Sequence, residues 1–143
     1  MKEADNQTNS EDAGLKILIA EDDEISGLLI SMAIKVICNK ILKSNNGFET
    51  VEICRNSPDI DFVLMDIKMP GIDGYEATRQ IRQFNKEVII IAQTAYALSG
   101  DKEKAIAAGC NDYISKPYGQ ALLTALMKKY IKRHGDELEK PEM

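Results

Sequence analysis

Short apolar runs alternate with amphipathic stretches along most of the chain. Short runs of consecutive apolar residues predict buried strands, and apolar residues three or four positions apart predict helices. On this basis we predict strands at residues 17–20, 41–42, 62–65, 88–92 and 112–115, the second being weak and toward an edge. We predict helices at about residues 25–36, 47–55, from 73 onward, 101–108 and 121–131.

The predicted helices carry recognisable packing and terminal signals. At the start of the helix from residue 73, we expect the Asp73 side chain to cap free backbone amides and Glu76 to reach back to this helix end, a variant of the capping box. Gly109 is a good C-cap for the helix at 101–108. An apolar stripe on the first helix comprises Ile25, Leu28, Leu29, Met32 and Val36. The last helix offers a similar set to the core, namely Leu122, Leu123, Leu126, Met127 and Tyr130.

Five strand–helix units in regular alternation predict an α/β fold, a parallel sheet with helices on both faces. The common solution for five strands is the doubly wound, flavodoxin-like (βα)5 sandwich with strand order 2-1-3-4-5. Residues 15–133 form the predicted domain. Residues 1–14 read as a polar leader or linker, and residues 134–143 as a polar C-terminal tail.

The composition narrows the class of protein. The 143 residues fit one soluble domain, and the net charge of −5 argues against nucleic acid or an anionic membrane as a partner of this chain. Cys38, Cys54 and Cys110 are widely spaced and lack a zinc or redox motif, so we expect reduced thiols. The chain has no apolar stretch long enough to span a bilayer and no signal-peptide pattern, which predicts a cytoplasmic location.

Charged and hydroxylic residues follow four of the predicted strands. Asp66 ends the third strand, Glu21 and Asp22 follow the first, Thr94 follows the fourth, and Lys116 follows the fifth. Strands one and three are neighbours in the predicted order, so their carboxylates meet at the carboxyl edge of the sheet. Carboxylates brought together there repel one another unless a cation joins them, and an oxygen-only site with room for water suits Mg²⁺.

The same cluster suits phosphoryl transfer. An incoming phosphoryl group meets Mg²⁺ on one side, the Lys116 ammonium on another and the Thr94 hydroxyl as a donor. Asp66 is the natural nucleophile, because a carboxylate attacks phosphorus without deprotonation and gives an acyl phosphate. Asp23, next to the acidic pair, is explained by the dipole of the helix that follows.

With these motifs the chain resembles the receiver domain of the two-component response-regulator family. The segments that carry the resemblance are Lys16–Asp22, Val63–Gly74, Gln93–Ala95 and Asp112–Pro117. Each segment alone is weak evidence, but together they span the predicted domain.

The resemblance implies a role for each matching residue. Asp66 is the phospho-acceptor, with Glu21 and Asp22 as the acidic pair that holds Mg²⁺, Asp22 directly and Glu21 largely through water. The backbone carbonyl of Lys68 is a further metal ligand. Three residues complete the set: Lys116 pairs with the phosphate, Thr94 is the switch hydroxyl, and Tyr113 is an aromatic switch that turns inward.

The resemblance also implies partners. The phosphoryl donor is a phosphohistidine on a histidine kinase or a histidine phosphotransfer protein, and the domain promotes its own phosphorylation and dephosphorylation. The stretches Thr94–Leu98 and Ala108–Tyr113 look most like receivers of hybrid sensor histidine kinases, whose kinase activity lies in other domains. A stand-alone single-domain response regulator is the alternative, and dimerisation stays open.

Three other functions fit the residues less well. A phosphatase of the haloacid-dehalogenase type wants a second carboxylate two residues after the nucleophile, where Lys68 stands. A flavin carrier needs a phosphate-binding loop after the first strand, where Glu21 and Asp22 would repel the phosphate. An inactive docking domain would not need the complete set of phosphorylation residues.

Overall fold

The parallel sheet and its strand order are as predicted. The structure, a computed structural model, describes residues 14–95 and 100–139, with the backbone alone from residue 132 onward. Its five parallel strands lie in the order β2-β1-β3-β4-β5. Their bounds are β1 Leu15–Ala20, β2 Cys38–Ser44, β3 Phe62–Asp66, β4 Ile89–Thr94 and β5 Asp112–Ser115.

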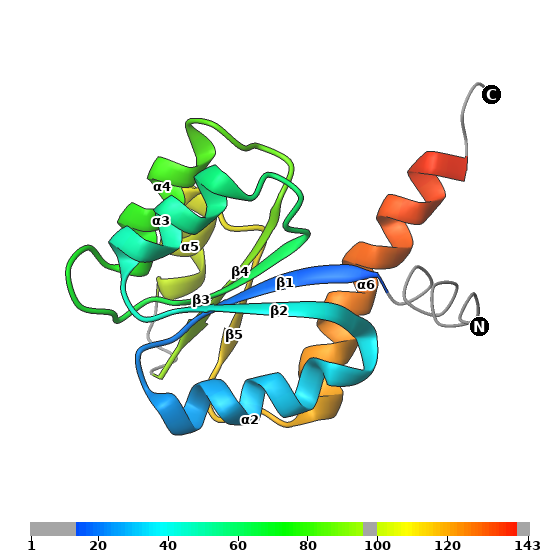
Figure 1. The fold of residues 1–143 in the computed structure, drawn as a ribbon, viewed down its shortest axis with the longest axis horizontal. Coiled ribbons are helices and arrows are strands. Elements are labelled where there is room, and N and C mark those ends of the chain that lie inside the picture. Colours follow the sequence, from blue (N-terminus) through cyan, green and yellow to red (C-terminus); the bar gives the residue numbers. More distant parts are fainter. Residues whose placement is uncertain (1–13, 96–99, 140–143) are drawn as a thin grey trace, which may run out of the picture.

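Helices cover both faces of this sheet (Figure 1). They are α2 Glu24–Ile34, the short 3-10 helix η1 Lys35–Ile37, α3 Gly47–Asn56, α4 Gly74–Arg82, α5 Asp101–Ala108 and α6 Gln120–Glu139. Helices α2 and α6 lie on one face, and α3, α4 and α5 lie on the other. In the described part of the chain, no helix combines the length and the apolar character of a membrane span.

Strand alternation divides the core into two layers. Leu18, Val63 and Ile90 face α3, α4 and α5. Their strand neighbours Ile19 and Leu64 face α2 and α6 instead. β3 is buried along its whole length, as expected for a central strand covered on both sides. The sheet therefore gives the residues at its carboxyl edge a rigid support.

Local capping is close to the prediction. The Asp73 side chain accepts a hydrogen bond from the backbone N–H of Glu76 at 2.9 Å. The prediction that Glu76 reaches back to the start of the helix is wrong, because its carboxylate instead accepts hydrogen bonds from the side chains of Arg79 and Gln80. Asp23 caps α2 through the backbone N–H of Ser26, in line with the structural role expected for it.

Helices α2 and α6 correct two predictions about the core. The predicted apolar stripe of α2 faces solvent, with exposed fractions of 53% at Leu28 and 60% at Leu29. The residues that enter the core from α2 are Ile30 and Ile34. In α6, Leu123 and Met127 are buried as predicted, but Leu122 is exposed. The other exposed members of the α2 stripe are Ile25, Met32 and, in η1, Val36.

Some element ends also differ from the prediction. β2 begins at Cys38 and is longer than the apolar pair at 41–42, because its edge position leaves it only half-buried and weakly patterned. α6 continues to Glu139, past its predicted end at residue 131. The predicted leader falls almost wholly on residues 1–13, which lie outside the described residues, as do Tyr96 and its neighbours at 97–99.

Candidate functional site

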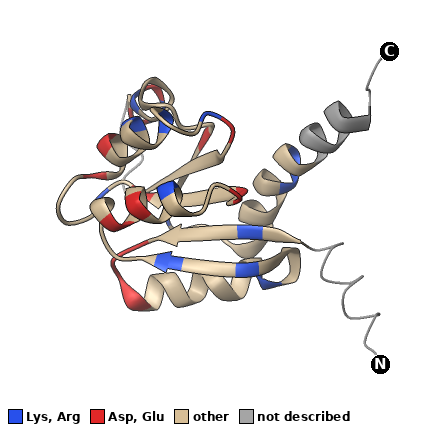
Figure 2. Cartoon of the chain, turned by 45° about the horizontal axis from the view of Figure 1, so that its top comes forward, with Lys and Arg blue, Asp and Glu red and all other residues tan. Residues whose placement is uncertain are grey.

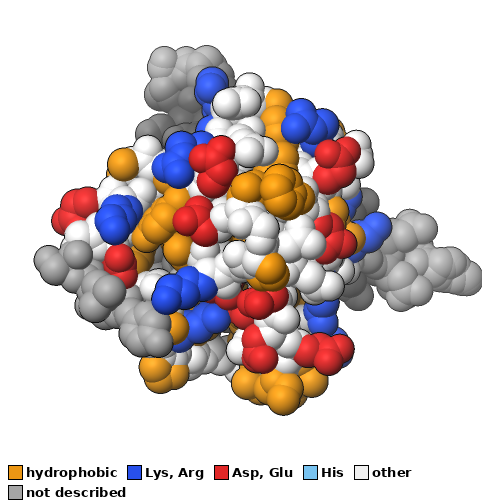
Figure 3. All heavy atoms as spheres, turned by 90° about the vertical axis from the view of Figure 1, so that its left-hand side faces the viewer, with side chains coloured by type: hydrophobic (Ala, Val, Ile, Leu, Met, Phe, Trp, Pro, Cys, Tyr) orange, Lys and Arg blue, Asp and Glu red, His pale blue; other side chains and the backbone are white. Residues whose placement is uncertain are grey.

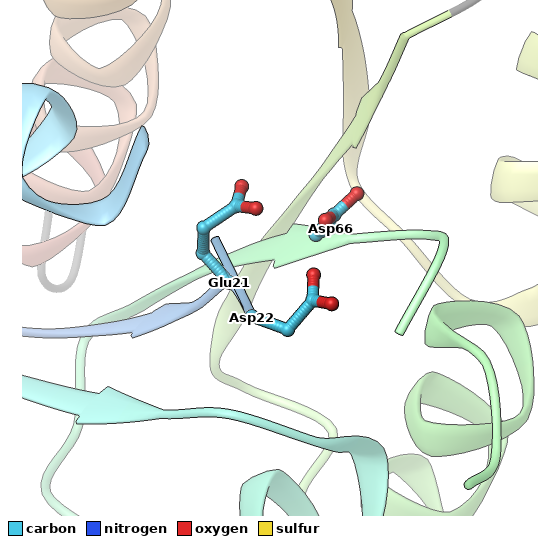
Figure 4. A group of neighbouring side chains, drawn as sticks. All are labelled: Glu21, Asp22 and Asp66. Carbon is cyan, nitrogen blue, oxygen red and sulfur yellow. The ribbon is translucent and has the colours of Figure 1, made fainter. Parts of the chain in front are cut away.

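Three carboxylates meet at the carboxyl edge of the sheet. Asp66 is the last residue of β3, and Glu21 and Asp22 follow β1, which pairs directly with β3. Each contributes an oxygen to a group whose atoms all lie within 4.8 Å of one another. Figure 4 shows the three side chains turned toward a common space. The predicted convergence of these residues is therefore present.

The three carboxylates differ in burial. Glu21 is 6% exposed and Asp66 is 7% exposed, whereas Asp22 is an exposed residue. Figure 2 shows acidic residues at the turn from β1 into α2. The cluster thus has a buried floor and a solvent-facing side where waters fit around an ion.

Lys116 reaches the same group from the end of β5. Its Nζ lies 2.8 Å from Glu21 Oε1 and 3.9 Å from Asp66 Oδ2. The backbone N–H of Lys116 donates to the carbonyl of Thr94 at 2.7 Å, so the ends of β4 and β5 are tied together. The Lys116 ammonium therefore contacts two of the three carboxylates, and within this group of four side chains negative charge is in excess.

The surroundings of Asp66 raise the pKa of its carboxyl group. Burial, followed by the nearby Glu21 carboxylate, raises the pKa of Asp66 from 3.8 to about 7. Lys116 and the backbone N–H of Lys68, which donates to Asp66 at 3.3 Å, act in the opposite direction. The donor set fits Mg²⁺, because a hard divalent cation takes carboxylate oxygens and relieves their mutual repulsion.

The turn after β3 holds Asp66 from behind. The backbone N–H of Gly74 donates to the carbonyl of Ile67 at 2.8 Å. A Cβ at Gly74 would lie 2.6 Å from the carbonyl oxygen of Asp66 and 2.8 Å from Ile67 Cα, closer than real Cβ atoms approach. Gly71 adopts φ +84°, a conformation that favours glycine. This turn therefore depends on its glycines to pack against the strand end.

Thr94 and Tyr113 lie on the last two strands, in agreement with the strand assignments predicted from the sequence. Thr94 is the last residue of β4, is buried, and pairs in register with Ser115. Tyr113 lies on β5, is half-buried, and packs against the core layer beneath α3, α4 and α5. Lys68 lies in the loop after Asp66, and its backbone N–H donates to the Asp66 carboxylate. The roles of these residues stay predictions.

Sequence reasoning missed two residues beside the cluster. Gln93 is fully buried in β4, and its side-chain oxygen accepts a hydrogen bond from the hydroxyl of Tyr118. The signals were present in the sequence. A glutamine interrupts an otherwise apolar strand next to Thr94, and a tyrosine follows the Lys116-Pro117 pair.

A groove of about 550 Å³ opens beside Lys116. Leu29, Ile30 and Met32 of α2 line one side, and Pro117 and Tyr118 line the other. Figure 3 views the carboxyl edge of the sheet and shows acidic side chains above an apolar patch at the lower edge of the molecule, over α2. The acidic cluster and an apolar surface are thus adjacent.

Comparison with known proteins identifies many relatives of this fold and site. The family model of the response regulator receiver domain matches residues 17–128. The sensor histidine kinase CheAY of Helicobacter pylori is 32% identical over 141 residues, which are 96% of this chain and 18% of that protein. The polar-differentiation response regulator DivK of Brucella anthropi is 31% identical over 118 residues, 80% of this chain and 94% of that protein.

Solved structures agree with these relatives. The receiver domain of the sensor histidine kinase PA1611 from Pseudomonas aeruginosa, which has a magnesium ion coordinated in its active-site cleft, gives a TM-score of 0.75 at 34% identity. The match covers 83% of this chain and 98% of that one. The receiver domain of Saccharomyces cerevisiae Ssk1, solved with the histidine phosphotransfer protein Ypd1, gives 0.70 at 34% identity over 80% and 85% of the two chains.

Proposed function

The chain belongs to the response regulator receiver domain family, and from this we propose that Asp66 accepts a phosphoryl group from a phosphohistidine in a Mg²⁺-dependent reaction. The observation that carries the proposal is the convergence of Glu21, Asp22 and Asp66 within 4.8 Å of one another, with the Lys116 ammonium beside them. Receiver domains act in two-component signalling, so the product is a signalling state of this domain.

The chemistry follows from the positions of the side chains. An ionised oxygen of Asp66 attacks the phosphorus, the P–N bond to the donor imidazole breaks, and an aspartyl phosphate forms. When bound by Glu21, Asp22, Asp66 and the Lys68 carbonyl, Mg²⁺ supplies positive charge against the phosphoryl oxygens. Lys116 exchanges its contact with Glu21 for one with the phosphoryl group.

Thr94 and Tyr113 carry the change outward. The Thr94 hydroxyl moves toward the new phosphoryl group, and the half-buried ring of Tyr113 turns into the space beside it. Since Tyr113 lies on β5 between α5 and α6, the surface that changes is formed by these two helices. A shift from mostly inactive to mostly active requires about 5.5 kcal/mol in favour of the active form.

The phosphoryl donor is a histidine kinase or a histidine phosphotransfer domain. The apolar stripe of α2 and the groove beside Lys116 offer it a docking surface, because exposed apolar residues gather next to the proposed acceptor. Ssk1 was solved with such a phosphotransfer protein, which supports the same class of partner here.

We propose that the chain is the receiver of a hybrid sensor histidine kinase. It spans less than a fifth of the first sensor kinases among its curated relatives. A stand-alone response regulator is the second candidate, favoured by the match over 94% of DivK. Both carry the same chemistry at Asp66, and they differ in what the phosphorylated surface contacts.

Incubation with acetyl phosphate and Mg²⁺, followed by intact mass spectrometry, tests the proposal. We expect the mass of one phosphoryl group to be added to the wild type, and neither to Asp66→Asn nor to wild type with EDTA. Asp59→Asn, an exposed carboxylate at the other end of β3, is the matched control and is expected to be phosphorylated normally. Equal uptake by Asp66→Asn would place the acceptor elsewhere.

A further inference from the structure

Gln93 lies on the same face of the sheet as the proposed phospho-acceptor. Gln93 and Asp66 are in register on adjacent strands β4 and β3. Directly opposed residues of neighbouring strands point to the same side of a sheet. Ile91, two residues earlier on β4, packs in the core layer beneath α2 and α6, so Gln93 faces this side as well.

Tyr118 meets Gln93 from the segment that follows β5. Its hydroxyl donates to Gln93 Oε1. Burial, with Glu21 and Asp66 nearby, holds the pKa of Tyr118 above its usual range, so the hydroxyl stays a donor. Gln93 is fully buried, and within the described residues its Nε2 has no hydrogen-bond partner.

A buried side-chain amide in a central strand lowers the stability of the fold when one of its polar atoms has no partner. Leaving a polar atom without a partner in the interior costs about 1–3 kcal/mol, whereas an apolar side chain of similar shape costs nothing of this kind. The rest of β4 up to Ala92 is apolar, in accordance with its position in the core. Stability alone therefore does not account for glutamine at this position.

The hydrogen bond joins the two segments that carry the phosphoryl-binding side chains. Gln93 immediately precedes Thr94, and Tyr118 is two residues beyond Lys116. The backbone bond from Lys116 N–H to the Thr94 carbonyl is a first tie between these segments. The hydrogen bond from Tyr118 to Gln93 is a second tie between them, made by side chains two residues beyond Lys116 in the sequence.

We propose that Gln93 and Tyr118 are positioning residues that hold the segment 116–118 so that the Lys116 ammonium meets the phosphoryl group on Asp66. The inference rests on the proposed function. It assigns to this pair no contact with the phosphoryl group, and its effect passes through Lys116. The ring of Tyr118 also lines the groove beside α2, so the hydroxyl is the part specific to positioning.

The test compares Tyr118→Phe, Gln93→Met and the double variant. Tyr118→Phe keeps the ring and leaves Gln93 Oε1 buried without its donor, so it loses stability, while the double variant regains stability because both partners are then apolar. With phosphoramidate and Mg²⁺, we expect the maximal phosphorylation rate to fall about tenfold in Tyr118→Phe and to stay low in the double variant, because misplaced groups slow the chemical step. The concentration of donor that gives half the maximal rate should change little.

Lys116→Gln separates positioning from a general loss of structure. In this background the rate is already low, and adding Tyr118→Phe should lower it no further, since the residue that Tyr118 positions is gone. Tyr130→Phe is the matched control. Its hydroxyl bonds the Asn111 carbonyl and Asp112 Oδ2 at the other end of β5, and we expect a wild-type rate.

Two results would overturn the inference alone. One is a wild-type rate in Tyr118→Phe. The other is a double variant whose rate recovers together with its stability, which would make the pair a packing feature. Failure of the wild type to gain a phosphoryl group on Asp66 would instead overturn the proposed function, and the inference with it.

Discussion

Replacing Asp66 with asparagine should stabilise the metal-free fold, although on the proposed function it should also abolish phosphorylation. Asp66 is buried beside Glu21, and these surroundings raise its pKa from 3.8 to about 7. A tenfold change in proton affinity corresponds to about 1.4 kcal/mol. Holding Asp66 ionised in the folded state therefore costs about 4 kcal/mol above pH 7. Asparagine keeps the shape and removes the charge, but it faces the Lys116 ammonium, so we expect a net gain of roughly 2–4 kcal/mol.

The gain has a defined pH dependence. Between pH 3.8 and about 7 the folded protein keeps the Asp66 proton while the unfolded chain has lost it. Raising the pH through this window therefore lowers the stability of the wild type relative to the variant. Below the window both states hold the proton and the contribution vanishes. Above the window neither holds it, and the difference is constant.

Urea unfolding followed by far-UV circular dichroism, in EDTA, measures this difference at pH values below, within and above the window. The chain has no tryptophan, so fluorescence is a poor probe. Asp59→Asn removes the same charge from an exposed site, where a hydrogen bond from Lys16 holds the pKa of Asp59 low, and it should bring no gain. Equal or lower stability of Asp66→Asn above the window would refute the reasoning.

Two further predictions concern the metal and the partner. Mg²⁺ should raise the melting temperature of the wild type. At a hundredfold excess over Kd, it should add up to about 2.7 kcal/mol to the free energy of unfolding. In a thermal scan, Asp22→Asn should show a smaller rise in melting temperature with Mg²⁺. An unchanged melting temperature in the wild type would count against the metal site. Leu29→Ser should slow transfer from a phosphohistidine protein roughly fivefold and spare phosphoramidate, since truncation at an interface centre costs about 1 kcal/mol. Ile106→Ser, on α5 across the sheet, is the control, and equal slowing in both variants would remove α2 from the docking surface.

The central strands and the acidic cluster were predictable because strong local patterns determine them. β1 and β3 are nearly continuous apolar runs on neighbouring strands, and a parallel sheet brings the residues at their carboxyl ends together whatever the details of the helices. Glu21, Asp22 and Asp66 therefore converge as the sequence indicates.

The orientation of α2 was not predictable from its pattern. Ile30 and Ile34 point into the core while Leu28 and Leu29 point outward, so the helix is apolar on both sides and its periodicity does not select a face. The choice comes from tertiary packing against the sheet and α6. Leu122 was misassigned to the core for the same reason, since its neighbour Leu123 is the buried residue.

The pair Gln93 and Tyr118 was missed for a different reason. The two residues are 25 positions apart and carry no joint motif, so their hydrogen bond is visible only once β4 and the end of β5 are placed together. A single polar residue in an apolar run is a weak signal, and only its burial reveals that it needs an explanation.

An outward leucine-rich surface on α2 has a consequence for signalling fidelity. Apolar contacts discriminate poorly, since a methylene more or less changes binding by only about 1–3 kcal/mol. Under the proposed docking of a phosphohistidine partner on this surface, its apolar part would accept many kinases. Selectivity would then depend on polar residues that line the groove, such as Ser26 and Gln120, because an incorrect kinase would leave them without hydrogen-bond partners. On that proposal, exchanging these two side chains would be the simplest way to change which kinase the domain accepts.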